Sequence, residues 1–364
     1  MPPVFHLTPV VVPAFGWVNQ KAKHVLPARF HPREGDMRIS RRALLIGAPA
    51  LWLSSNDLAA ADTYQYDALG RLVRVTFSDG KFVVYRYDAA GNRTEVVRSD
   101  NTTFTATLQV TGTGPVNLRS IANAGGYGGA QHISITFQVG SAVTITGAAT
   151  SNNGGIAIDT GTWPSDIFTT TLALQVSGKV YGGGGAGASG GGAFNAAPGW
   201  QGGDAIYCRE NIGITVNSGG QVKGGGGGGG SGAGWTREFT DSEGQPVITD
   251  YPAGGGGGGF PNGLGGSGNG SGANGTTGGG GSGGVGGGSS GGGPGSANRI
   301  NGSGGTGGGA AATGSTGGTP SGTGGSATWV AGNPGTGGQP GYAVRKNSRT
   351  VTVTNNGTVT GTIG

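Results

Sequence analysis

Side chains that could support hydrolytic chemistry are few and widely spaced. The chain has a single cysteine, Cys208, and four histidines, which are His6, His24, His31 and His132. A Ser/His/Asp triad would have to use His132, which lies in a β-like segment with no nucleophile elbow. One cysteine allows no disulfide and no thiolate metal cluster. The sequence therefore indicates a protein that is not an enzyme, with no metal site, no cofactor and a structural role for His132.

A second group of side chains is suited to recognition. Aromatic and Arg side chains supply contact area and directed hydrogen bonds. They gather in residues 231–253, the longest stretch between two polyglycine runs, and in shorter stretches at 194–200, 260–264, 297–301 and 328–334. The candidate binding residues are Trp200, Trp235, Arg237, Phe239, Tyr251, Phe260, Arg299 and Trp329. Alternatively, Trp200 and Trp235 cap the glycine region by covering glycine faces.

The elements that position these residues are dominated by glycine. Among 364 residues, 88 are Gly and 17 are Pro, a composition typical of low-complexity chains. Gly does not recur at every third position, which excludes collagen. Runs at 182–185, 224–230, 254–259, 278–281 and 286–288 are too regular for ordinary turns. Extended helices of three residues per turn without Cβ atoms can bond backbone to backbone. We expect a polyglycine II-like bundle with loops over 182–342, with disorder as the alternative.

Strand-like segments flank the glycine region. Residues 101–181 alternate Thr, Val and Ile in short runs and predict a β domain. A strand, an Asn/Ser-Gly turn and a short strand ending in Gly recur at 172–182, 214–224 and 351–361. We expect these copies to clamp the glycine region and residues 343–364 to form a C-terminal β-hairpin. The predicted fold class is all-β, with short β-hairpin repeats and a small β domain followed by the polyglycine II-like bundle.

Residues 62–100 contain an internal repeat. The pattern of residues 64–72, with Tyr-x-Tyr-Asp at its start and a Gly at its seventh position, recurs 21 residues later at 85–93. Each Asp-x-x-Gly supplies an acceptor side chain and a permissive residue that close a hairpin. The pattern resembles the YD (RHS) repeats of bacterial secreted proteins, whose long arrays wind into β shells. Two copies cannot close a shell, so we expect a β stalk or connector.

The first 61 residues have the order of an export signal. A basic segment that begins at Met37, an apolar run and a final Ala-Ala-Ala predict a twin-arginine-like signal peptide over 37–61. The apolar run is too short to span a bilayer, so no permanent membrane anchor is expected. Residues 1–36 precede this signal and are expected to be untranslated, with Met37 as the true start, or disordered.

The charge distribution argues against nucleic acid as a partner. The formal charge is +5, but the excess lies in residues 1–61, and residues 254–342 contain one charged side chain, Arg299. Tracking a phosphate backbone requires clustered Lys and Arg.

Residues 157–164, the joins between strands and polyglycine, and the glycine runs resemble phage tail proteins and glycine-rich tail-fibre-tip adhesins over roughly residues 150–364. In that group, a polyglycine II sandwich carries variable distal loops that touch a bacterial receptor. The resemblance implies a non-enzymatic surface-binding protein on a virion tail, with a cell-surface protein or glycan as its receptor. The export signal and YD repeats depart from this pattern, because phages assemble in the cytoplasm. A secreted bacterial structural protein, self-associating into extracellular fibres or matrix, is the alternative.

Overall fold

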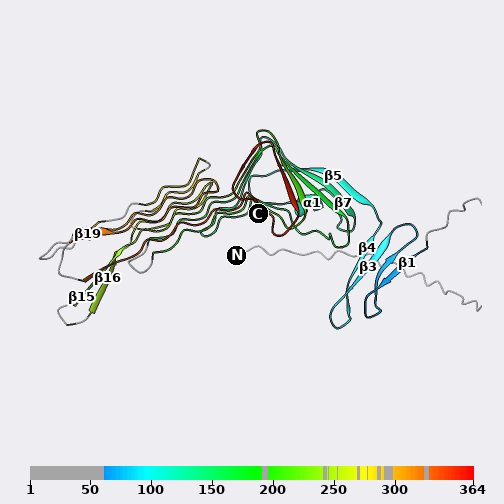
Figure 1. Ribbon diagram of the computed structural model, residues 1–364, viewed down its shortest axis with the longest axis horizontal. Coiled ribbons are helices and arrows are strands. Elements are labelled where there is room, and N and C mark those ends of the chain that lie inside the picture. Colours follow the sequence, from blue (N-terminus) through cyan, green and yellow to red (C-terminus); the bar gives the residue numbers. More distant parts are fainter. Residues whose placement is uncertain are drawn as a thin grey trace, which may run out of the picture. The chain divides into compact units, whose positions relative to one another are not determined.

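The computed structural model describes residues 61–190, 196–240, 244, 246–251, 253–268, 271–276, 278–284, 288–290, 298–323 and 328–364. The expected leader and signal peptide, up to residue 60, lie outside this set. The described residues form 23 strands and one short helix, which confirms the all-β class (Figure 1). No helix in this part of the chain is long and apolar enough to cross a membrane.

The YD repeats form an antiparallel sheet. Its strands, in spatial and chain order, are β1 (Thr63–Tyr66), β2 (Leu72–Thr76), β3 (Phe82–Tyr87) and β4 (Arg93–Ser99). The Asp67 carboxylate accepts the backbone N–H groups of Leu69 and Arg71, both at 2.9 Å, and so closes the first turn. Asp88 accepts the N–H of Asn92 at 2.8 Å in the equivalent turn. The hairpins expected from the repeat are confirmed.

Three parallel sheets follow. The first has the order β22 (Val351–Asn355), β13 (Ile212–Val216), β10 (Thr170–Val176), β7 (His132–Val139) and β5 (Thr103–Val110). The second has the order β23 (Thr358–Thr360), β14 (Gln221–Lys223), β11 (Lys179–Tyr181) and β8 (Thr144–Thr146). The third has the order β21 (Val344–Arg345), β12 (Ile206–Tyr207), β9 (Ile158–Asp159) and β6 (Val116–Asn117). Because the chain visits the three sheets in turn, it forms the stacked coils of a three-sided β-solenoid.

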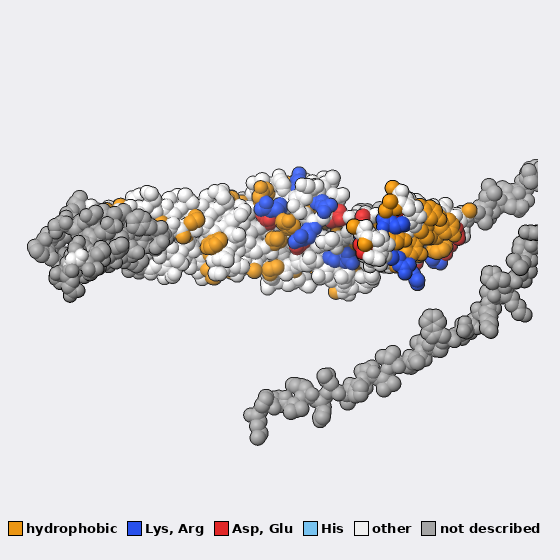
Figure 2. All heavy atoms as spheres, turned by 90° about the horizontal axis from the view of Figure 1, so that it is seen from below, with side chains coloured by type: hydrophobic (Ala, Val, Ile, Leu, Met, Phe, Trp, Pro, Cys, Tyr) orange, Lys and Arg blue, Asp and Glu red, His pale blue; other side chains and the backbone are white. Residues whose placement is uncertain are grey.

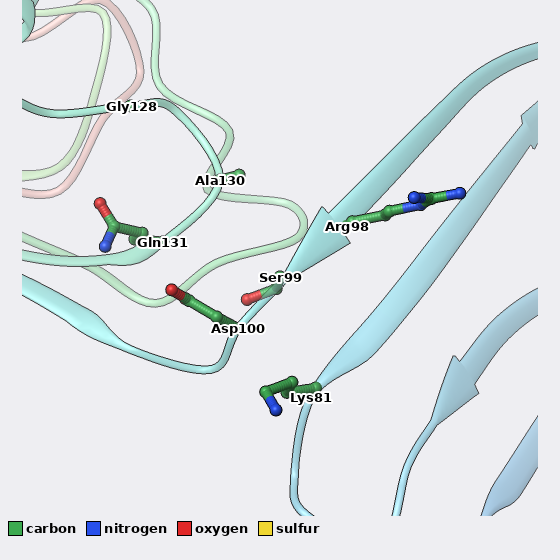
Figure 3. A pocket seen from close by; sticks show the side chains of 7 residues that line it. All are labelled: Lys81, Arg98, Ser99, Asp100, Gly128, Ala130 and Gln131. Atoms are coloured by element: carbon green, nitrogen blue, oxygen red, sulfur yellow. The ribbon is translucent and has the colours of Figure 1, made fainter. Parts of the chain in front are cut away.

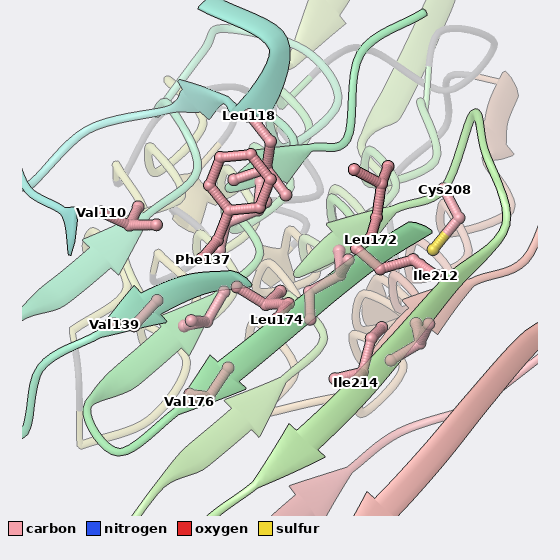
Figure 4. Close-up of a cluster of buried hydrophobic side chains, with 14 of the residues drawn as sticks. Val110, Leu118, Phe137, Val139, Leu172, Leu174, Val176, Cys208, Ile212 and Ile214 are labelled. Atoms are coloured by element: carbon pink, nitrogen blue, oxygen red, sulfur yellow. The ribbon is translucent and has the colours of Figure 1, made fainter. Parts of the chain in front are cut away.

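The core of the solenoid is built by the alternation of apolar residues along these strands. Leu174 lies in register with Phe137 on one side and Ile214 on the other, and all three are fully buried (Figure 4). The single helix, α1 (Leu118–Ala124), buries Leu118 and Ala122 in the same core. The sequence interpretation assigned this segment to the β domain, because seven residues are too few to show a helical period.

The expected C-terminal β-hairpin is wrong. Its two strands, β22 and β23, do not pair with each other; each pairs in parallel with the same strand of the preceding motif copy, β13 and β14. The Asn/Ser-Gly segments are therefore corners between two faces. A Cβ at Gly220 would lie 2.2 Å from the carbonyl oxygen of Val176 in the coil before, so glycine here permits close stacking of coils.

The glycine-rich region is an insertion at one corner of the solenoid. Between the second and third sheets, the connecting chain lengthens with each coil, from residues 147–157 to 182–205 and then to 224–343. Residues 101–181 and 343–364, expected as separate units, thus build the same solenoid.

Inside this region the backbone forms a lattice. Each N–H group of residues 225–233 donates to a neighbouring segment, and the acceptors change in a period of three. Successive residues donate to segments 197–203, 254–260 and 312–318 in rotation, at 2.7–3.1 Å. A period of three in three directions fits an extended helix with three residues per turn. The polyglycine II conformation itself stays a prediction.

The carbonyl groups of the same segment face three further neighbours. They accept N–H groups from residues 185–188, 302–308 and 335–341 at 2.7–3.0 Å, so six segments surround residues 225–233. A Cβ at Gly228 would lie 1.8 Å from the carbonyl oxygen of Ala186. This backbone-to-backbone packing requires glycine and satisfies buried N–H and C=O groups.

Candidate functional site

A small antiparallel sheet stands at the end of the glycine segments that is remote from the solenoid. It has the order β16 (Pro246–Tyr251), β15 (Trp235–Thr240) and β20 (Thr328–Ala331) (Figure 1). The lattice segment 225–233 leads directly from β14 to β15.

This sheet brings together five of the eight candidate binding residues. Trp235 lies opposite Tyr251, and Arg237 lies opposite Trp329, in the strand pairing. Phe239 follows Arg237 at a spacing of two residues, so strand alternation places all five positions on one face of the sheet. Trp235 is only 8% exposed, which agrees with the capping role considered for it.

A second small sheet holds Arg299. It has the order β17 (Gly288–Ser290), β18 (Asn298–Ile300) and β19 (Ser321–Thr323). Arg299 occupies the central strand, opposite Ser289 and Gly322. The sequence did not predict strands β17 and β19, because they consist of Ser, Gly and Thr, which are frequent throughout the glycine region.

The remaining two candidates lie apart from both sheets. Trp200 is 43% exposed, and its backbone belongs to the lattice, since its carbonyl accepts the N–H of Gly228 at 2.8 Å. Phe260 is 3% exposed and packs edge-on against Tyr181, with ring centroids 5.2 Å apart. The structure therefore places Phe260 among the packing residues.

A cavity of about 470 Å³ lies elsewhere, between the YD sheet and the solenoid. It is lined by Lys81, Arg98, Ser99, Asp100, Gly128, Ala130 and Gln131 (Figure 3). Lys81 is paired with Asp79 at 2.7 Å, which raises the pKa of Lys81. Asp100 accepts the Thr102 hydroxyl at 2.7 Å, which lowers the pKa of Asp100. Arg98 extends away from Asp100 and Gln131 (Figure 3). Since Lys81 and Asp100 already have partners, the cavity does not present a prepared charged site.

The two side chains most suited to catalysis, His132 and Cys208, are engaged in packing. The His132 Nδ1 accepts the backbone N–H of Thr169 at 3.0 Å, and its ring contacts Phe168 edge-on. Cys208 is fully buried, and burial raises the pKa of its thiol to about 12, so the thiolate is disfavoured. Within the described residues, no three His, Cys, Asp or Glu side chains are placed to hold a metal ion.

Comparison with known proteins gives two family matches. The family described as phage tail fibre adhesin Gp38 matches residues 103–364. The RHS repeat family matches residues 66–103, the part that forms the YD sheet. Among curated proteins, no sequence matches significantly.

One solved structure is similar over most of its length. It is the crystal structure of the gp37-gp38 adhesin tip complex of the bacteriophage S16 long tail fibre. The sequence identity is 22% and the TM-score is 0.40, and the alignment covers 73% of this chain and 83% of that chain.

Proposed function

The chain belongs to the phage tail fibre adhesin Gp38 family, and on this premise we propose that it binds a bacterial cell-surface receptor through its two small sheets. Membership in this family places the protein on a virion tail and favours the adhesin over the secreted structural protein. The export signal expected for residues 37–61 stays a prediction.

The observation that carries the proposal is the gathering of aromatic and Arg positions on one face of the sheet formed by β15, β16 and β20. Arg237 and Trp329 are more than ninety residues apart in the chain and lie opposite each other in the pairing. Arg and Trp are enriched among residues that dominate binding energy. The lattice supports this sheet with backbone bonds and presents few side chains of its own, so recognition falls to the sheets and their loops.

The proposed contact residues are Arg237, Phe239, Tyr251, Arg299 and Trp329, with Trp200 as a separate exposed position.

Cell binding by point variants tests the proposal. Arg237→Ala combined with Trp329→Ala should reduce binding of the purified protein to susceptible bacteria by at least tenfold and leave the circular dichroism spectrum unchanged. Leu264→Ser is the matched control, because Leu264 is 39% exposed and lies outside both sheets. Undiminished binding by the double variant, or an equal loss in the control, would contradict the assignment.

A further inference from the structure

The YD sheet exposes apolar side chains on one face. Its opposite face meets the solenoid, where the Phe82 ring lies 5.6 Å from that of Phe168. Strand pairing places Tyr64, Val75 and Val83 together on the other face, where Val75 itself is buried and 6% exposed. Tyr64 is 55% exposed and Tyr66 is 61% exposed. Hydrophobic side chains gather over this part of the molecule, with Lys and Arg beside them (Figure 2). Such surfaces mark interaction sites.

The two edge strands of this sheet differ in charge, and only one of them is suited to pairing with a further strand. The edge strand β4 carries Arg93, Glu95 and Arg98, and charges of this kind prevent pairing with another strand. The other edge strand, β1, reads Thr-Tyr-Gln-Tyr, with all four residues exposed and neither charge nor proline. Among the described residues, only β2 pairs with β1. Within the part of the chain that the structure describes, the outer edge of β1 is therefore open and carries no charge.

We propose that a second copy of this chain pairs its own β1 with this edge, antiparallel and with the two-fold axis at Gln65. The two YD sheets then form one continuous eight-stranded sheet. This register sets Tyr64 opposite Tyr66 of the second copy, and aromatic pairs are favourable across antiparallel strands. It also sets Gln65 opposite Gln65. The chain already forms amide pairs between neighbouring strands, Gln109 to Gln138 at 2.8 Å and Gln138 to Gln175 at 3.0 Å.

Charge excludes the face-to-face alternative. Arg98 lies in register with Val83 on the apolar face, and neither Arg93 nor Arg98 forms an ion pair within the described part of the chain. Packing two such faces together would bury these cations without a carboxylate partner. Pairing through β1 places no charge of the strand itself at the junction, because Thr63–Tyr66 has none. The nearest carboxylate, that of Asp67 opposite Thr63, already has Arg71 as its partner at 2.7 Å.

The predicted dimer is weak. A buried Tyr contributes about 150–250 Å², and the four tyrosines at the junction are already about half covered, so the apolar gain is on the order of 500 Å². Stable interfaces bury about 1,200 Å² or more. Association should therefore depend on concentration, and a covalent trap is the suitable assay.

Disulfide trapping in the full chain tests the register. In Gln65→Cys, the two equivalent residues face each other at about 5 Å between Cα atoms, within disulfide range. The native Cys208 is fully buried and does not interfere. Mild oxidation should yield at least tenfold more covalent dimer in Gln65→Cys than in the control Thr94→Cys on the β4 edge. Adding Tyr64→Lys to Gln65→Cys should reduce the yield about tenfold without changing the circular dichroism spectrum.

Sedimentation equilibrium and amide exchange complete the test. The unmodified chain should approach twice its monomer mass as its concentration rises, and exchange at residues 63–66 should slow in parallel. The proposal is wrong if both cysteine variants cross-link equally, or if the chain stays monomeric at every concentration. It is also wrong if the N–H groups of residues 63–66 that point away from β2 exchange slowly in the monomer, because another part of the chain would then cover the edge.

Discussion

Gly228 lies where the lattice leaves no space for a Cβ atom. The atom closest to an added Cβ is a backbone carbonyl oxygen, which cannot rotate away as a side chain would. We expect Gly228→Ala to lower the free energy of unfolding by roughly 3 kcal/mol or more, at the upper end of overpacking effects. Thermal denaturation measures the change.

The control for this substitution lies in the same region. At Gly309 an added Cβ meets nothing within 4 Å, and we expect Gly309→Ala to melt close to the wild type. Equal melting temperatures for the two variants would show that residues 225–233 are not packed as the structure has them.

Asp204 makes a second residue-scale prediction. Its carboxylate is 6% exposed, accepts Arg345 Nη2 at 3.0 Å and accepts the backbone N–H of Tyr342 at 2.9 Å. These contacts join the chain just before β12 to the end of the longest glycine insertion, residues 224–343, and to β21. Asp204→Asn removes the charge of the acceptor and should cost about 2 kcal/mol of stability, as expected for hydrogen bonds to charged groups.

Chemical denaturation checks this value against an exposed pair. Lys81 and Asp79 have side chains more than half exposed, so Lys81→Gln should leave the free energy of unfolding nearly unchanged. If Asp204→Asn is equally mild, the Asp204–Arg345 pair does not hold the insertion in place.

At the scale of elements, the YD turns predict a response to acid. The backbone N–H of Arg71 is the main cause of the lowered pKa of Asp67, and the side-chain amide of Asn92 is the main cause for Asp88. A carboxyl with a lowered folded-state pKa stabilises the fold above its ordinary value near 3.8 and loses this effect as pH falls through the folded value. Opening of the YD sheet should therefore become easier below about pH 4.

Amide exchange of β2 and β3 between pH 5 and pH 2, corrected for intrinsic rates, measures this opening. The double variant Asp67→Asn, Asp88→Asn should show a flatter pH dependence than the wild type. An unchanged pH dependence in the variant would assign the acid response to other carboxyls.

The sequence predicted the YD hairpins well, because Asp-x-x-Gly determines a turn within a few residues. It predicted the strands of the recurring motif but not their pairing, because an Asn/Ser-Gly step suits a hairpin and a solenoid corner equally. Which of the two forms depends on stacking between residues such as Val176 and Gly220, far apart in the chain. Composition likewise located Arg237 and Trp329 as candidates. Their pairing follows from the return of the glycine insertion, which no local pattern encodes.

At the scale of the whole molecule, the solenoid and the lattice share one set of hydrogen bonds. The rows of the second parallel sheet continue into glycine, where Gly147 donates to Tyr181, Gly182 to Lys223 and Gly224 to Thr360, at 2.8–3.1 Å. Stacked coils thus fix the starting positions of successive glycine segments. Glycine loses more backbone entropy on ordering than any other residue and buries no side chain. We infer that the lattice depends on the solenoid for its order.

This dependence yields the last prediction. Leu174→Ala removes a fully buried side chain from the solenoid core and should cost about 2–5 kcal/mol. If the lattice opens only together with the solenoid, amide exchange of residues 225–233 should accelerate by the same free energy, although none of these residues belongs to the buried core cluster that contains Leu174. A Phe77→Ser variant in the turn between β2 and β3, where Phe77 is 41% exposed, should leave that exchange unchanged. Protection of residues 225–233 that survives Leu174→Ala would instead show that glycine segments hold together by their mutual hydrogen bonds alone.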